Sequence, residues 1–218
     1  MTLGLFDDEP PQPAQPSLVL APGAMVLRGF ALGAASALRQ GVQQVTAQAP
    51  FRHLITPGGL TMSVAMTNCG PLGWVSDRSG YRYDSTDPDS GRRWPPLPAA
   101  FTALAHDAAQ AAGFASFAPD ACLINRYAPG TRLSLHQDKD ERSYEHPIVS
   151  VSLGIPAVFL LGGAQRSDRP LRVPLAHGDV VVWGGPARLR YHGVLPLAQA
   201  EHPLTGGYRI NLTFRKAG

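Results

Sequence analysis

The chain has 218 residues, which is enough for one domain with a sizeable hydrophobic core. Only 16% of the residues are charged while 23 are Gly and 21 are Pro, and this composition favours a turn-rich, mainly β domain over a helical bundle. The formal net charge of +3, carried mostly by Arg, is compatible with a polyanionic partner but does not by itself indicate one.

The cysteines and the N-terminus bear on the cellular compartment. Cys69 and Cys122 are the only cysteines and form no C-x-x-C pair, so we expect reduced thiols and no disulfide framework. Asp7, Asp8 and Glu9 stand where a signal peptide would carry basic residues, and no apolar run approaches the roughly 18 residues of a membrane span. We therefore expect a cytoplasmic protein that does not enter a membrane.

The N-terminal half of the chain mixes helical and extended patterns. The apolar spacing of Leu38, Val42 and Val45 indicates one amphipathic helix, and Phe101, Leu104 and neighbouring alanines indicate a second that ends near Gly113. In chain order we predict a disordered Pro-rich tail over 1–17, a strand over 24–27, a helix over 31–48, a strand over 61–68, an aromatic-bearing loop region over 71–91, and the second helix.

From residue 121 onward the pattern changes to short β runs divided by Gly-containing turns. The predicted strands cover 121–127, 132–136, 147–153, 156–161, 171–175, 179–183, 188–194 and 208–215. Short strands at nearly regular spacing are typical of a sandwich or jelly roll. We therefore expect one structural domain with an N-terminal part over 18–120 and a β core over 121–218.

Two H-x-D tripeptides are candidate metal chelates, and the residues around them differ. His177-Gly178-Asp179 precedes an apolar run, so we interpret it as a turn in which Asp179 accepts hydrogen bonds from local backbone N–H groups. His136-Gln137-Asp138 lies at the end of an alternating run, where period 2 places His136 and Asp138 on one face, as chelation requires.

A third ligand is expected from a distant strand, and His192 meets this requirement. A single His in a strand is more often a satisfied polar residue, but here the H-x-D pair lacks a partner, and Gly193 would let the backbone approach a metal. Two imidazoles and one carboxylate form the ligand set of a non-haem Fe(II) site, which leaves positions open for a co-substrate and O2.

The last predicted strand points to the co-substrate. Period 2 places Arg209, Asn211, Thr213 and Arg215 on one face, and two arginines on an inner face are explained if they meet the carboxylates of a small diacid. The alternative is a polar face that meets solvent. Asn125 and Tyr127 share a face of their own strand and could donate to a carboxylate without adding charge.

These motifs together resemble the AlkB family of Fe(II)/2-oxoglutarate-dependent nucleic-acid dealkylases, from about Gly23 to the C-terminus. The segments that carry the resemblance are Pro57-Gly58-Gly59, Ser63 to Gly70, Asn125-Arg126-Tyr127, His136 to Glu141, and Arg209 to Arg215. The resemblance implies a double-stranded β-helix (jelly-roll) core with two supporting helices and an N-terminal nucleotide-recognition lid. It also implies a monomer that acts on single-stranded or flipped-base nucleic acid.

The resemblance assigns a role to each candidate residue. It implies Fe(II) at His136, Asp138 and His192, and 2-oxoglutarate at Asn125, Tyr127, Arg209, Asn211 and Arg215. It implies that Trp74 stacks on the target base opposite His136, that Asp140 contacts an exocyclic amine, and that Met66 and Leu123 line the pocket. Thr56, Tyr81 and Arg166 are expected to touch the nucleic-acid backbone or the base edge. Arg78, Arg82 and Tyr83 lie in the same aromatic-bearing segment and could meet phosphates or stack on bases.

The implied reaction is oxidative demethylation of 1-methyladenine or 3-methylcytosine, with 2-oxoglutarate decarboxylated and formaldehyde released. Because these lesions are cationic, we hypothesise that Asp140 favours them over neutral bases. The alternatives are a 2-oxoglutarate oxygenase that acts on a protein or small molecule, and a non-catalytic nucleic-acid-binding module. The sequence leaves open DNA against RNA, the range of lesions, and duplex against single strand.

Overall fold

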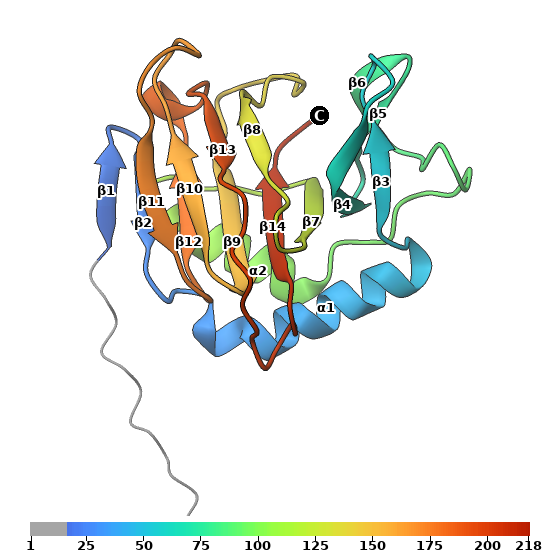
Figure 1. The fold of residues 1–218 in the computed structure, drawn as a ribbon, viewed down its shortest axis with the longest axis horizontal. Coiled ribbons are helices and arrows are strands. Elements are labelled where there is room, and N and C mark those ends of the chain that lie inside the picture. The colour runs from blue at the N-terminus through green and yellow to red at the C-terminus, as the bar shows by residue number, and fades with distance from the viewer. Residues whose placement is uncertain (1–16) are drawn as a thin grey trace, which may run out of the picture.

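Two β-sheets face each other, and two helices pack against the outer face of the larger sheet (Figure 1). The structure, a computed structural model, describes residues 17–218, so the predicted tail over 1–17 lies outside the described residues except for its last position. Strands dominate and two α-helices accompany them, so the prediction of a mainly β fold with two supporting helices is confirmed.

The larger sheet has eight strands in the order β1-β2-β12-β9-β14-β7-β4-β3, and the smaller has four in the order β11-β10-β13-β8. All neighbours are antiparallel. The larger sheet contains β1 (Leu18–Ala21), β2 (Ala24–Leu27), β3 (Arg52–Ile55), β4 (Thr61–Cys69), β7 (Ala121–Tyr127), β9 (Ile148–Gly154), β12 (Val180–Trp183) and β14 (Arg209–Arg215). The smaller contains β8 (Leu133–His136), β10 (Ala157–Leu161), β11 (Leu171–Leu175) and β13 (His192–Val194).

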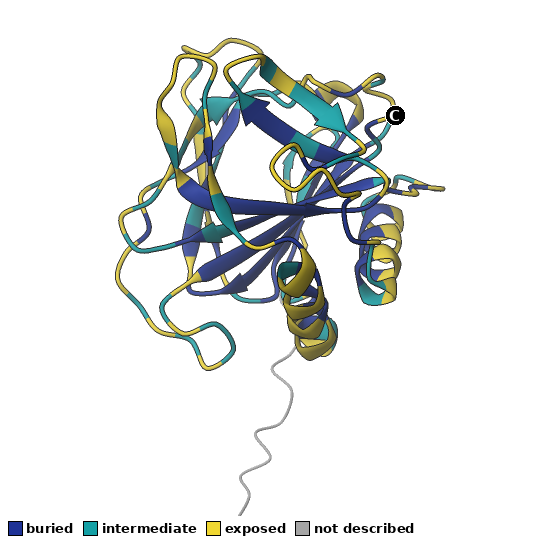
Figure 2. Ribbon diagram, turned by 90° about the vertical axis from the view of Figure 1, so that its right-hand side faces the viewer, coloured by how far each residue is buried: buried dark blue, intermediate teal, exposed yellow. Residues whose placement is uncertain are grey.

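The helices α1 (Ala35–Gln48) and α2 (Ala99–Ala111) bury one side each against the larger sheet, as Figure 2 shows. A short 3-10 turn, η1 (Leu32–Ala34), leads into α1, which ends before Pro50 because a following proline disfavours helical backbone at Ala49. A Cβ on Gly41 would lie 2.6 Å from the ring of Phe101, so the glycine lets the two helices approach closely. None of the helices in residues 17–218 has the length and apolar character needed to cross a membrane.

The central strand β14 places a polar row inside the molecule. It lies between β9 and β7, and every one of its residues is buried. Ile210, Leu212 and Phe214 belong to the core beneath the helices, whereas Arg209 and Arg215 line a cavity between the two sheets. The predicted alternation is therefore confirmed, and the alternative of a solvent-facing polar strand is wrong.

Three parts of the fold differ from the sequence-based prediction. Residues 71–91 are not a plain loop, because β5 (Gly73–Asp77) and β6 (Gly80–Asp84) pair as a two-stranded hairpin. The edge strands β1 and β3 were not predicted. The strand expected over 188–194 is reduced to β13, because a 3-10 turn, η2 (Gly185–Ala187), and an irregular segment precede it.

Candidate active site

His136 and Asp138 of the H-x-D motif and the distant His192 lie together between the two sheets. His136 ends β8, Asp138 follows in the loop, and His192 begins β13 directly opposite His136 in the antiparallel register. Nε2 of His136 lies 3.5 Å and Nε2 of His192 lies 3.6 Å from the nearest oxygens of Asp138. The three ligand atoms lie within 4.8 Å of one another, which is close enough for one metal ion to contact all three.

Backbone carbonyls fix the orientation of both imidazoles. Nδ1 of His136 lies 2.9 Å from the carbonyl oxygen of Ser134, and Nδ1 of His192 lies 3.1 Å from the carbonyl oxygen of Arg190. Since a carbonyl only accepts, each Nδ1 must carry the proton, and in the neutral ring Nε2 is then a free lone pair. Such a bond to the remote nitrogen is the usual support of a metal-bound histidine.

Asp138 is the ligand whose charge most clearly suits a cation. Burial alone would raise the pKa of Asp138, but the charge of Arg215, together with the contacts to His192 and His136, holds it well below its ordinary value. Burial, followed by the neighbouring His136, lowers the pKa of His192. Burial also acts to lower the pKa of His136, yet the hydrogen bond and charge of Asp138 outweigh it and raise that pKa. The donor set is thus one carboxylate and two imidazoles, which fits Fe(II) with open coordination positions.

The surroundings of the Arg209 side chain favour the binding of an anion. Its side chain is 2% exposed, and its Nη2 donates to Oγ of Ser152 at 2.9 Å. Its Nε and Nη1 have no hydrogen-bond partner among residues 17–218, although both are buried. The central carbon of the guanidinium lies 5.1 Å from the ring centroid of Tyr127. A buried cation with two unused donors fits a carboxylate that would arrive with a ligand.

Arg215 differs from Arg209 because protein carboxylates already surround it. Its Nη2 and Nε lie 2.6 Å and 3.0 Å from Oδ2 of Asp138, and its Nε lies 3.3 Å from Oε1 of Glu141. These anions raise its pKa further above the ordinary arginine value, against the effect of burial. The expectation that Arg215 holds one end of a diacid stays a prediction, and its first contact here is the candidate metal ligand.

Asn211 organises the neighbouring polar groups. Its amide nitrogen donates to Oγ of Ser150 at 2.8 Å and to the carbonyl of Val151 at 2.9 Å, while its oxygen accepts from Thr213 and, at 3.4 Å, from Asn125. The amide oxygen of Asn125 is buried without a donor among residues 17–218. Sequence reasoning missed Ser150 and Ser152, which the pattern of two alternate serines in an otherwise apolar strand could have indicated.

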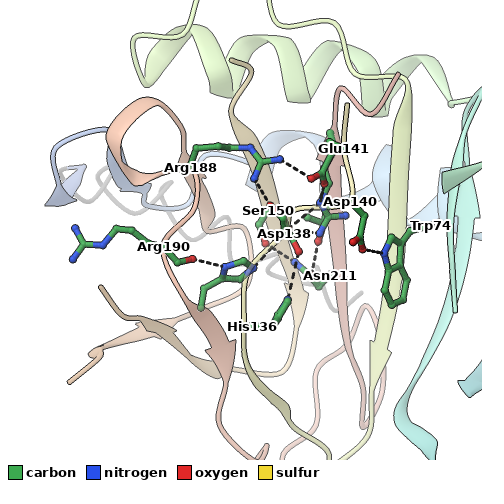
Figure 3. Close-up of polar contacts among 12 residues, drawn as sticks. Trp74, His136, Asp138, Asp140, Glu141, Ser150, Arg188, Arg190 and Asn211 are labelled. Carbon is green, nitrogen blue, oxygen red and sulfur yellow. Dashed lines mark hydrogen bonds and ion pairs between the residues drawn. The ribbon is translucent and has the colours of Figure 1, made fainter. Parts of the chain in front are cut away.

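The base-recognition candidates surround the same cavity, whose volume is about 560 Å³. Trp74 stacks on Tyr81 with ring centroids 5.5 Å apart, and its indole Nε1 donates to Asp140 at 2.8 Å (Figure 3). Asn68 holds the backbone of Trp74 through bonds to both its N–H and its carbonyl. The cavity is also lined by the other predicted residues, Thr56, Met66, Leu123, His136 and Arg166.

A buried ionic cluster that the sequence did not reveal connects the hairpin to the metal ligands. Glu141 accepts from the phenol of Tyr83 at 2.9 Å and pairs with Arg188 at 3.0 Å. Arg188 also donates to the backbone carbonyl of Asp138 at 2.8 Å. The hydroxyl of Tyr83 is thus engaged by this cluster while the residue also lines the cavity, and its role as a stacking platform stays a prediction. Arg82 is likewise paired within its own hairpin, with Asp77 at 2.9 Å.

The competing H-x-D tripeptide has the structural role predicted for it. Asp179 accepts from the backbone N–H of Gly29 and of Ala176 and pairs with Arg28 at 2.6 Å. The neighbouring strand gives a further reason for the glycine at position 193. A Cβ at Gly193 would lie 2.6 Å from the carbonyl oxygen of Leu133, so the close approach of β8 requires glycine here, and its role beside a metal stays a prediction.

Comparison with known proteins agrees with this geometry. The profile of the 2OG-Fe(II) oxygenase superfamily matches residues 23–215. The alpha-ketoglutarate-dependent dioxygenase AlkB of Salmonella typhimurium is 60% identical over 99% of this chain and 98% of its own length. The chain belongs to the AlkB family of Fe(II)/2-oxoglutarate oxygenases. AlkB of Escherichia coli is 58% identical over 91% of this chain and 92% of its own length.

Among solved structures, that of OsALKBH1 matches the AlkB fold of this chain with a TM-score of 0.80 and 30% identity, over 92% of this chain and all of that one. The jelly-roll prediction is therefore confirmed. As a member of the AlkB family the protein is a dioxygenase that uses Fe(II), 2-oxoglutarate and O2. The His136, Asp138 and His192 cluster supplies an arrangement suited to that iron.

Proposed function

We propose that this protein removes methyl groups oxidatively from 1-methyladenine and 3-methylcytosine in single-stranded DNA or RNA. The observation that carries the proposal is one continuous cavity that touches the metal ligands, the orphaned donors of Arg209 and the Trp74–Asp140 pair. An oxygenase that acts on small molecules would need only the first two of these features. The aromatic and acidic pair adds a surface suited to a cationic planar base.

The proposed roles follow from the donor types. His136, Asp138 and His192 hold Fe(II), and Arg209 receives a carboxylate of 2-oxoglutarate. Asn125, Tyr127, Asn211 and Arg215 complete the co-substrate pocket. Arg215 also lies 2.6 Å from the carboxylate of Asp138 and neutralises it. The same arginine would therefore contact both the co-substrate and a metal ligand. Together the bound iron, 2-oxoglutarate and O2 supply the oxidising chemistry that hydroxylates the methyl carbon, with succinate and CO2 as co-products.

The substrate must present a base out of its stack, because the target atom of a paired and stacked base cannot reach the cavity. Trp74 is proposed to stack on the extruded base, while Asp140 accepts from its exocyclic amine. Met66 and Leu123 form an apolar wall that excludes water, and both are buried. Tyr81 is 47% exposed and Arg166 is exposed, and both line the cavity together with Thr56, which supports a role of these three residues in contacting the nucleic-acid strand.

The names of more distant relatives agree with a nucleic-acid substrate. A human protein that is 34% identical over 60% of this chain is called nucleic acid dioxygenase ALKBH1, and this chain spans about a third of that protein's length. We further propose a cytoplasmic monomer. Free thiols at Cys69 and Cys122, which lie opposite each other on β4 and β7, are consistent with a reducing compartment.

The decisive experiment follows a singly methylated oligonucleotide incubated with the enzyme, Fe(II), 2-oxoglutarate and O2. We expect the mass to fall by one methylene unit and formaldehyde to appear in equal amount. The matched control is Asp138→Ala, which should give neither product. Uncoupled 2-oxoglutarate turnover that no methylated oligonucleotide stimulates would refute a nucleic-acid substrate while leaving the oxygenase intact.

A further inference from the structure

A second cavity lies on the opposite side of the larger sheet from the iron site. Its volume is about 320 Å³, at the lower end of ligand-binding pockets. The helix α1, the strands β7, β9 and β14 and the segment before β14 line this cavity, which opens to solvent on one side. The lining residues are Arg39, Val42, Gln43, Thr46, Phe51, Arg126, Leu153, Leu204, Thr205, Tyr208 and Ile210. Its lining residues thus come from α1, which Figure 1 locates, and from the side of the sheet that faces this helix, and none of them lines the cavity that holds the iron ligands.

The charge in this cavity is of one sign. Arg39 and Arg126 line it, and none of its lining residues within 17–218 is acidic. Arg126 is also the one incompletely buried residue of β7. Its guanidinium has no hydrogen-bond acceptor or carboxylate partner in the described part of the chain, whereas Arg28, Arg188 and Arg215 each pair with a carboxylate.

Two aromatic rings pack close to the guanidinium of Arg126 and restrict its position. Its central carbon lies 4.7 Å from the ring centroid of Phe51 and 5.1 Å from that of Tyr208. Rings in these positions restrict the long side chain and displace water from the guanidinium, while its N–H groups stay available. Arg39 is anchored as well, because its Nε donates to the carbonyl of Leu204 at 3.0 Å.

The rest of the lining is largely apolar. Val42, Leu153, Leu204 and Ile210 supply alkyl groups, and Gln43, Thr46 and Thr205 supply the polar part. A hydrated inorganic anion has no apolar surface to bury against these alkyl groups. A ligand with a hydrocarbon chain would gain binding free energy by burying that chain against them. We propose that this cavity is a second binding site, and that it takes a small carboxylate with an apolar chain, with the carboxylate on Arg126.

Hexanoate is a suitable probe. Its binding would be measured by isothermal titration calorimetry on the full chain loaded with Fe(II) and saturated with 2-oxoglutarate, without O2, so that the carboxylate site at Arg209 is already filled. We expect saturable binding of hexanoate. We also expect much weaker binding of 1-hexanol, which lacks the charge, and of inorganic phosphate, which lacks the chain. Absence of hexanoate binding, or equal binding of phosphate, would overturn the proposal.

Variants locate the site. Arg126→Gln should weaken hexanoate binding about tenfold or more, because a charge-assisted bidentate contact is lost. Gln43→Glu should weaken it as well, by placing an anion at the exposed rim of the cavity without removing packed groups, so a folding defect of the first variant cannot hide the result. Arg172→Gln, an exposed change on β11 in the other sheet, should leave binding unchanged. Equal weakening by all three would indicate general charge attraction and overturn the site.

Discussion

Arg209 donates one N–H to Oγ of Ser152, while two of its other nitrogens are buried without a partner among residues 17–218. Each unsatisfied buried donor is unfavourable by about 1–3 kcal/mol. A bound carboxylate would remove this unfavourable contribution. The co-substrate is therefore expected to stabilise the fold as well as to take part in the reaction.

Arg209→Gln should weaken 2-oxoglutarate binding at least ~100-fold, because the buried carboxylate proposed to bind Arg209 loses its arginine partner. Calorimetric titration of the Fe(II)-loaded protein in the absence of O2 measures this directly. Ser152→Ala is the matched control. It removes only the hydrogen bond that positions the guanidinium, so a loss of roughly fivefold is expected. Unchanged affinity in Arg209→Gln would show that the diacid is held elsewhere.

The two H-x-D tripeptides should respond differently to the same substitution. Asp138→Asn is expected to abolish retention of Fe(II), measured as metal content after anaerobic desalting. Asp179→Asn should retain the metal but lower the free energy of unfolding by about 2–3 kcal/mol, since Asp179 accepts two backbone N–H groups and pairs with Arg28. Metal loss in Asp179→Asn with an intact fold would contradict the assignment.

Asp140→Asn should reduce the preference for cationic lesions, because the charge that attracts them is removed. We expect the ratio of kcat/KM for 1-methyladenine to that for the neutral 1-methylguanine to fall about tenfold. Trp74→Phe is the control, since it keeps an aromatic ring but deletes the N–H that Asp140 accepts. That variant should keep the preference, and an unaltered ratio in Asp140→Asn would exclude charge selection.

Glu141→Gln should destabilise the protein by about 3–5 kcal/mol, because Arg188 and Arg215 would lose an anion in a buried cluster. Urea unfolding monitored by tryptophan fluorescence measures the change. Tyr83→Phe removes one neutral donor to the same carboxylate, so about 1 kcal/mol is expected. Similar small effects in both variants would mean that the two arginines find other partners.

Stability should fall as the pH drops below neutrality, in part through His177. Burial, and then the neighbouring His202, lower the pKa of His177 below its ordinary value of 6.5. The unfolded chain therefore takes up this proton at a higher pH than the folded chain, and stability is lost as the pH falls through 6.5. His177→Gln should flatten the decline in Tm between pH 7.5 and 5.5, whereas His106→Gln on the exposed side of α2 should not. Equal declines in Tm in the unmodified protein and both variants would show that His177 does not contribute to this pH dependence.

Local patterns predicted the β core well. The strands β7 and β11 have the predicted bounds, and the apolar positions of α1 are buried as expected. Alternation succeeds here because each strand has two distinct sides, one facing the other sheet and the opposite one beneath the helices in the centre of the larger sheet or largely exposed in a strand such as β11. The hairpin of β5 and β6 was missed because its residues are mixed in polarity. Its conformation depends on contacts such as Tyr83 with Glu141, which are distant in sequence.

The candidate site was predictable at the level of residue types but not of pairings. The spacing of His136 and Asp138, with a distant histidine, correctly indicated one cluster. The local sequence does not indicate that Arg215 contacts Asp138 or that Arg188 pairs with Glu141, since these pairs join separate strands and loops. Such partners are decided by the packing of the two sheets.

Asp138, Asp140 and Glu141 fall within four consecutive positions, and between them they contact the metal-binding histidines, Trp74 and the buried arginines Arg188 and Arg215. An insertion or deletion in this stretch would displace all three together. Adaptation to new lesions is therefore expected to proceed by single substitutions on the Trp74 and Tyr81 side of the cavity. Directed evolution libraries for altered base preference should accordingly diversify the hairpin and keep the length of this stretch constant.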